Sequence, residues 1–158
     1  MTLKLTFETT IDATPYVVWD RVVGLERWPE VINAITNVEI LTDGPVGVGT
    51  TFRETRVMFG REESQEMTIS EFHEPSRLAF DAEAHGCKYH TLKRFEPIGS
   101  GQTRLVMEFG AEPQTLVAKI LGAITGPLAK GAVCKGIEGD LADIKAACEG
   151  RSGEDGDG

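Results

Sequence analysis

The chain has 158 residues, of which 41% are hydrophobic and 26% are charged, so it has the length and composition of one soluble domain with a sizeable core. Its formal net charge of -9 repels phosphate backbones and anionic lipid headgroups, which argues against nucleic acid as a partner. The N-terminal residues alternate apolar and polar and lack the continuous apolar core of a signal peptide, so we expect a cytoplasmic protein.

The first part of the chain predicts one strand followed by two short helices. Apolar and polar residues alternate over Leu3–Ile11, which is the pattern of a half-buried strand. Tyr16–Val23 has helical spacing and ends at Gly24, and Leu25–Ile32 predicts a second short helix. The glycine between them indicates a bent pair of helices.

The middle of the chain predicts a series of strands joined by short turns. Consecutive strands of this kind form an antiparallel meander, and with the first strand they make a sheet of about seven strands. The expected strands are Val38–Leu41, Thr50–Phe59, Arg61–Phe72, Arg77–Ala84, Cys87–Phe95 and Thr103–Ala111.

The segment Pro113–Glu149 is the only long stretch with a helical period, and Gly126-Pro127 predicts a kink or short break near Thr125. A helix with one apolar face must bury it, and the sheet is the only large partner available. Residues 150–158 contain no apolar side chain, so we expect one domain over 1–149 and a disordered tail over 150–158. The apolar stripe of the helix comprises Val117, Ile120, Leu121, Ile124, Leu128, Val133, Ile137, Leu141, Ile144 and Cys148.

Several short motifs follow one another between Leu3 and Glu149. The stretch Val17–Val31 resembles the first helices of the START-like (SRPBCC) helix-grip proteins, and among them it is most similar to the polyketide cyclase/dehydrase and lipid-transport family. Further pieces agree with this family in their order and spacing: Gly49–Phe52, Glu71–Leu78, Phe95–Pro97 with Gln102–Leu105, and Leu141–Glu149.

The resemblance implies an α+β helix-grip fold, in which a curved sheet wraps around the last helix and a cavity lies between them. It also implies a small hydrophobic ligand, because family members bind lipids, sterols, polyketides, quinones or plant hormones. A minority catalyse cyclisation or dehydration. The family has no universal catalytic motif, so the resemblance assigns no catalytic residue, and kinship of fold does not decide function.

The strand Thr50–Phe59 carries two charged residues, Glu54 and Arg56, on the same face as Phe52 and Met58. On a concave face they would lie in the cavity and orient the polar end of a ligand; on a convex face they would be a solvated pair. The residues that we expect to line the cavity are Trp28, Phe52, Glu54, Arg56, Met58, Ile69, Phe80, Tyr89, Leu105, Met107, Leu121 and Gly122.

The candidate acids and bases for cyclisation or dehydration are His73, His85 and His90, together with inward-facing carboxylates and tyrosines. His85, Cys87 and Tyr89 alternate onto one face, but no second pair has ligand spacing, so we expect no metal and no cofactor. The three cysteines, Cys87, Cys134 and Cys148, lack a Cys-x-x-Cys spacing, and we expect reduced thiols.

Three functions remain open at this point. The first is a module that binds a small hydrophobic or amphipathic molecule, lipid, polyketide or quinone-like, between sheet and helix. The second is a cyclase/dehydrase-type enzyme in the same cavity, favoured if two or more of Glu54, Arg56, Tyr89 and His90 line it within hydrogen-bond reach. The third is a domain with a filled core that acts through protein contacts. The sequence leaves the oligomeric state open, and membrane contact by Leu116–Val133 is disfavoured because Lys119 and Lys130 are its only cations.

Overall fold

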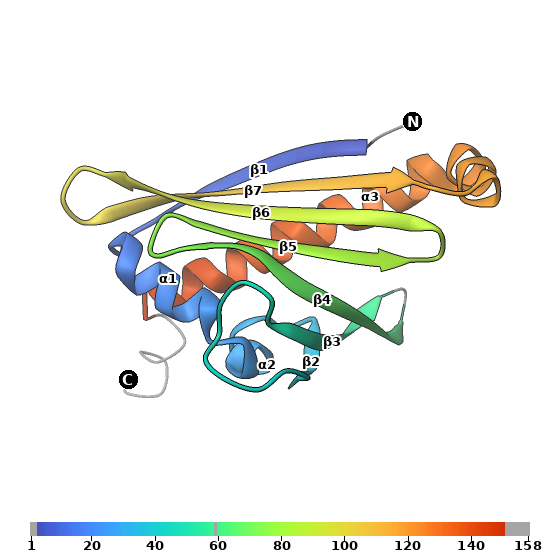
Figure 1. Ribbon diagram of the computed structural model, residues 1–158. Coiled ribbons are helices and arrows are strands. Elements are labelled where there is room, and N and C mark those ends of the chain that lie inside the picture. The colour runs from blue at the N-terminus through green and yellow to red at the C-terminus, as the bar shows by residue number, and fades with distance from the viewer. Residues whose placement is uncertain (1–2, 59, 151–158) are drawn as a thin grey trace.

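The computed structural model describes residues 3–58 and 60–150, and within residues 121–129 it describes the backbone alone. A single seven-stranded antiparallel sheet, in the order β1-β7-β6-β5-β4-β3-β2, curves around the long helix α3 (Figure 1). This is the helix-grip arrangement that the sequence predicts. The strands are β1 (Leu3–Ile11), β2 (Ile35–Ile40), β3 (Thr51–Met58), β4 (Arg61–His73), β5 (Arg77–Ala84), β6 (Cys87–Ile98) and β7 (Gln102–Pro113).

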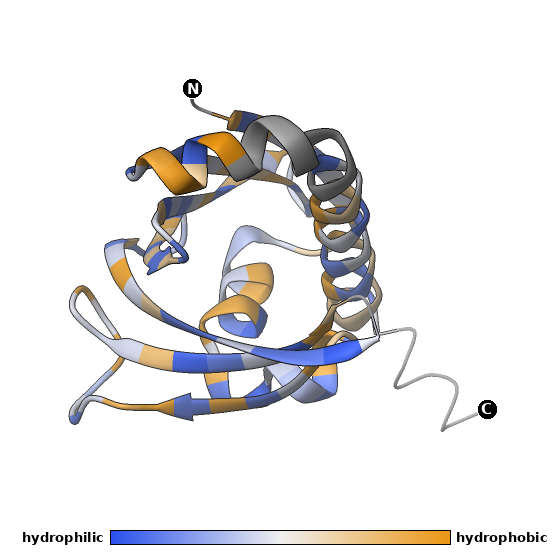
Figure 2. Cartoon of the chain, turned by 90° about the vertical axis from the view of Figure 1, so that its right-hand side faces the viewer, coloured by the Kyte–Doolittle hydropathy of each residue, from blue (hydrophilic) through white to orange (hydrophobic). Residues whose placement is uncertain are grey.

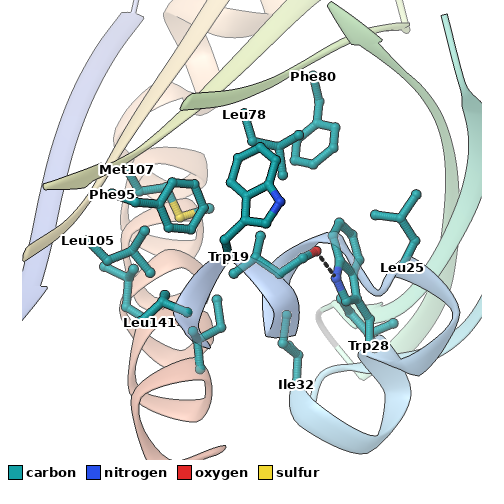
Figure 3. Close-up of a cluster of buried hydrophobic side chains, with 14 of the residues drawn as sticks. Trp19, Leu25, Trp28, Ile32, Leu78, Phe80, Phe95, Leu105, Met107 and Leu141 are labelled. Carbon is teal, nitrogen blue, oxygen red and sulfur yellow. Dashed lines mark hydrogen bonds between the residues drawn. The ribbon is translucent and has the colours of Figure 1, made fainter. Parts of the chain in front are cut away.

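Two short helices and one 3-10 turn close one end of the sheet. Helix α1 spans Pro15–Val23, the 3-10 turn η1 spans Leu25–Arg27, and α2 spans Trp28–Val31. The predicted second helix is therefore split at Trp28. Its indole Nε1 donates a hydrogen bond of 2.8 Å to the carbonyl oxygen of Val22, which ties α2 back to α1 (Figure 3).

Helix α3 spans Leu116–Cys148 and begins three residues later than predicted. Glu112-Pro113 does not open the helix, because β7 continues its pairing with β6 as far as Pro113, which lies opposite Cys87. Thr115 is the N-cap residue, and its hydroxyl accepts a hydrogen bond of 3.0 Å from the Ala118 amide. Gly86, at a φ of 76°, packs so closely on Thr115 that a Cβ there would lie 2.6 Å from the threonine hydroxyl.

The predicted apolar stripe is buried over the C-terminal part of α3 but not at its beginning. Ile137, Leu141 and Ile144 belong to the core. Val117 and Ile120 are 66% and 52% exposed, so this part of the prediction is wrong. The first turn instead contacts the β5–β6 turn through Thr115 and the buried Ala118, which directs Val117 and Ile120 to solvent.

Polar contacts fasten the C-terminal end of α3 to the start of the chain. Lys145 Nζ donates to the Thr10 carbonyl oxygen at 2.8 Å and to Glu149 at 2.7 Å. Glu149 in turn accepts a hydrogen bond of 2.8 Å from the Asp12 amide. The backbone of α3 is helical throughout Leu116–Cys148, so Gly126-Pro127 does not interrupt the helix and the short break considered near Thr125 is not found. The predicted tail lies outside the described residues from residue 151 onward.

Aromatic side chains fill the space between the short helices and the sheet. Trp19 packs edge-to-face on Phe72, with ring centroids 5.1 Å apart. It packs in the same way on Phe95, at 5.3 Å (Figure 3). Trp28 packs in the same way on Phe52 and Phe80, at 5.4 and 5.8 Å. Of the described helices, none is long and apolar enough to cross a membrane.

We predict that Leu141→Ala lowers the free energy of unfolding by roughly 2–5 kcal/mol, because it leaves a cavity where α3 meets the sheet. Leu141 is 4% exposed and lies in the core cluster. Leu116→Ala, on the same helix at 73% exposure, is the control and should change the stability by less than about 0.5 kcal/mol. Chemical denaturation of both variants measures the difference, and equal losses would contradict this assignment of the buried face.

Candidate functional site: a charged cluster inside the grip

The inward-facing side chains change from buried to half-buried along every long strand of the sheet. On β6, Phe95 and Lys93 are buried, whereas Thr91 and Tyr89 are half-buried. The change has the same direction on the neighbouring strands, away from α1 and α2 and towards the first turns of α3; Figure 2 views the molecule from this more exposed end. The half-buried inward residues include Phe7, Arg56, Met58, Met67, Ala82, Tyr89, Thr91, Phe109 and Val133.

An ion-paired cluster lies where this change occurs. Glu54 and Arg56 point from β3 towards α3, so they occupy the inner face of the sheet. The Arg56 guanidinium donates to both Glu54 carboxylate oxygens, at 2.9 and 3.2 Å, and to both Asp140 oxygens, at 3.0 and 3.4 Å. Glu54 and Asp140 are 7% and 6% exposed, so these pairs are largely removed from water.

Lys93 is the fourth charged residue of the cluster. It lies on β6 and is 6% exposed, and its Nζ lies 4.8 Å from the Phe80 ring centroid and 5.9 Å from that of Trp28. Within the described part of the chain, no oxygen accepts a hydrogen bond from this nitrogen. Lys93 Nζ is not one of the fully buried, unpartnered polar atoms of the described residues, so it keeps a small accessible surface at which its N–H groups can meet an acceptor.

Burial shifts the protonation equilibria of the cluster. Loss of hydration lowers the pKa of Lys93 from 10.5 to about 8, although the fields of Asp140 and Glu54 partly oppose it. Burial also raises the pKa of Asp140, against the opposing effect of Arg56. The pKa of Arg56 is raised, because its hydrogen bonds and ion pairs with Glu54 and Asp140 outweigh its own desolvation.

The outer face of the sheet carries a shallow hollow of about 680 Å³. Its lining includes Thr68, Asp81 and His90, which are neighbours across β4, β5 and β6 and alternate with the inward-facing side chains. His90 Nδ1 lies 2.5 Å from an Asp81 oxygen, and both side chains are more than half exposed. The hollow is separated from the charged cluster by the sheet, and its open polar surface resembles a solvated face.

The structure brings some of the predicted site residues together and separates others. Trp28, expected to line the cavity, is 4% exposed and belongs to the core. Tyr89 faces inward and stacks on Phe109 at 6.0 Å, with its pKa raised by burial and by Cys87, whereas His90 faces outward. Met58 is half-buried, and the side chains of Leu121 and Gly122 are outside the described residues. The other predicted residues are buried in the core: Phe52, Ile69, Phe80, Leu105 and Met107.

Two members of the cluster, Lys93 and Asp140, were missed in the sequence. Lys93 alternates with Tyr89, Thr91 and Phe95, so the period of a strand places it on their face. Asp140 lies three residues after Ile137 and four before Ile144, which is the spacing of the buried stripe. The signal that could have identified both residues was therefore a charged residue at the spacing of the buried apolar residues around it.

The histidine and cysteine candidates do not join the cluster. His73 lies at the exposed end of β4, and His85 lies in the β5–β6 turn at a φ of 53°. The three cysteines are unpaired and half-buried. In residues 3–58 and 60–150 no group of three or more His, Cys, Asp or Glu side chains is arranged to hold a metal ion.

The sequence over residues 2–149 matches the family described as polyketide cyclase / dehydrase and lipid transport. The chain belongs to this family. No sequence among curated proteins matches it.

Solved structures share the fold at low sequence identity. The Zhui aromatase/cyclase from Streptomyces sp. R1128 has a TM-score of 0.81 and 15% identity over 96% of both chains. A START superfamily protein from Mycobacterium smegmatis has a TM-score of 0.76 and 16% identity over 92% of this chain and 97% of that one. The di-domain ARO/CYC BexL has a TM-score of 0.77 and 20% identity over 94% of this chain and 50% of that one. At such identities these likenesses establish the fold only.

We predict that the native protein gains stability relative to Lys93→Met as the pH rises from about 8 to about 10.5. Over this range the folded protein has already lost the Lys93 proton while the unfolded chain still binds it, so stability rises with pH. The relative gain should be at most about 3 kcal/mol, and it should vanish below pH 8, where both states are protonated.

Denaturation of both proteins at a series of pH values measures this difference. Cys148 and Tyr89, whose pKa values are also raised, titrate in both proteins, so their contributions cancel in the comparison. A difference that stays constant with pH would contradict the buried position of Lys93.

Proposed function

We propose that the chain binds a small apolar or amphipathic molecule, such as a lipid, polyketide or quinone-like compound, against the inner face of the sheet. The observation that carries this proposal is the change from buried to half-buried inward side chains at the level of the charged cluster. An apolar body would lie along Met67, Tyr89 and Phe109, where each Å² removed from water contributes roughly 25 cal/mol.

The polar end of the ligand would lie at Lys93. Arg56 already donates to two carboxylates, whereas Lys93 has aromatic rings and no oxygen beside its nitrogen among the described residues. An oxygen atom of the ligand would supply the missing acceptor and relieve part of the desolvation cost. The family description includes lipid transport, which is consistent with a bound amphipathic molecule.

We predict that Thr91→Phe weakens the binding of the fluorescent probe 8-anilinonaphthalene-1-sulfonate by about tenfold or more, which corresponds to about 1.4 kcal/mol. Thr91 is half-buried on the inner face next to Lys93, so a phenyl ring there occupies the proposed site. His90→Phe, one residue away on the outer face, is the matched control and should leave the affinity within about twofold. A native protein that binds no probe would favour the third possibility, a filled core and a role in protein contacts.

A second candidate is a polyketide cyclase/dehydrase-type enzyme at the same place. The observation that favours it is that one cluster holds both Lys93, whose pKa is lowered to about 8, and Asp140, whose pKa is raised, and that the two groups interact electrostatically. Groups shifted towards neutral pH can accept and donate protons, and the neighbouring Arg56 can stabilise an enolate oxygen. The hydrogen bonds between Glu54 and Arg56 place two of the residues considered for such an enzyme beside each other on the inner face, which supports this candidate.

We predict that such an enzyme accelerates the loss of water from 4-hydroxy-4-phenylbutan-2-one, in which a proton next to the ketone and the hydroxyl group leave together. The conjugated ketone that forms is followed by its ultraviolet absorbance. Asp140→Asn should reduce the rate by about a hundredfold, the usual scale of acid–base catalysis, whereas Glu138→Gln, exposed on the same helix, should not change it. A rate equal to that in buffer would leave ligand binding as the better proposal.

A further inference from the structure

We infer that Lys93 is a nucleophile, and that it captures the carbonyl group of an aldehyde or ketone ligand as a reversible imine. This inference rests on the proposed binding of a ligand at the inner face. It goes further because it names the reactive atom, Nζ of Lys93, and the chemical class of the ligand.

The geometry around Lys93 leaves its nitrogen available for a covalent bond. Two ring faces, those of Phe80 and Trp28, lie beside Nζ, and an aromatic ring cannot accept a lysine proton as a carboxylate would. The two carboxylates of the cluster are hydrogen-bonded to Arg56 instead. Along β6 the adjacent inward residue is the half-buried Thr91, so the nitrogen lies at the inner end of the more exposed face.

The protonation equilibrium supplies the reactive form. With its pKa lowered to about 8, roughly a tenth of Lys93 is neutral at pH 7, whereas a lysine of ordinary pKa is neutral in fewer than about one molecule in a thousand. Only the neutral amine has a lone pair with which to attack a carbonyl carbon. Desolvated lysines of this kind are the ones that proteins use for Schiff-base chemistry.

The reaction is balanced without an oxidant or reductant. The Nζ lone pair forms a bond to the carbonyl carbon, and a proton moves from nitrogen to oxygen to give a carbinolamine. Loss of that hydroxyl group with the remaining amine proton releases one water molecule and leaves the C=N bond. Asp140 and Glu54, whose fields favour a positive charge at Nζ, would also favour the protonated imine.

The experiment uses the native chain, 2-naphthaldehyde and sodium cyanoborohydride, which reduces an imine to a stable secondary amine. Peptide mapping by mass spectrometry then locates the label. We expect Lys93 to be labelled about tenfold faster than the exposed Lys88 at pH 7, since far more of its amine is neutral. Lys93→Arg should lose this fast labelling and keep that of Lys88.

A matched probe separates failure of the inference from failure of the proposed function. Naphthalene-2-methanol has the same ring system but no carbonyl group, so it can bind without forming an imine. If it binds and competes with the aldehyde for Lys93, both proposals are supported. If it binds while the aldehyde labels only exposed lysines, the inference is overturned and ligand binding stands. If neither compound binds and Lys93 stays unlabelled, both are overturned.

Discussion

The Arg56 guanidinium is the interaction on which the interior of this protein depends. It joins β3, near one edge of the sheet, to α3 through four hydrogen bonds to Glu54 and Asp140. Removing one member of such a buried set leaves an uncompensated charge and typically costs about 3–5 kcal/mol, whereas replacing all of them by apolar groups is often neutral. A cluster of this kind is thus poor evidence of selection for stability alone, and its place on the inner face points to a role in binding or catalysis.

The same cluster lies between two regions of the interior that differ in packing. Towards α1 and α2, the aromatic rings around Trp19 and Trp28 fill the space and leave little room for a ligand. Towards the first turns of α3, the inward side chains are only half-buried. If the proposed ligand enters from that end, it meets an apolar surface first and the charged residues last, so we expect an amphipathic molecule to bind with its polar end innermost.

The fold was predictable because its signals are periodic and repeated. Alternation located the first strand, short turns marked the ends of the other strands, and steps of three and four residues located α3. The start of α3 was placed too early because Pro113 suits a first helical turn, yet the pairing with Cys87 extends β7 through that residue. Val117 and Ile120 were misassigned because hydrophobicity indicates which residues share a face, but not where that face leaves the sheet.

The site was harder to predict because its residues come from different elements. Glu54 and Arg56 were found on one strand, but their orientation could not be decided without knowing where α3 lies. Lys93 and Asp140 resemble surface residues by type and were not predicted as site residues, although their spacing placed them among buried neighbours. The residue type of these two side chains suggested exposure, whereas their spacing relative to apolar neighbours indicated burial correctly.

Lys93 also shows why stability alone does not explain the interior. A methionine would fill much of the same volume, would contact the Phe80 and Trp28 rings, and would carry no charge to desolvate. Desolvation lowers the pKa of Lys93 to about 8, so the folded protein disfavours the ammonium form. A desolvated charge lowers the stability of the folded protein. Proteins therefore retain such groups chiefly at functional sites. The cost of burying this nitrogen is therefore the physical reason for our proposal that the ligand binds at Lys93.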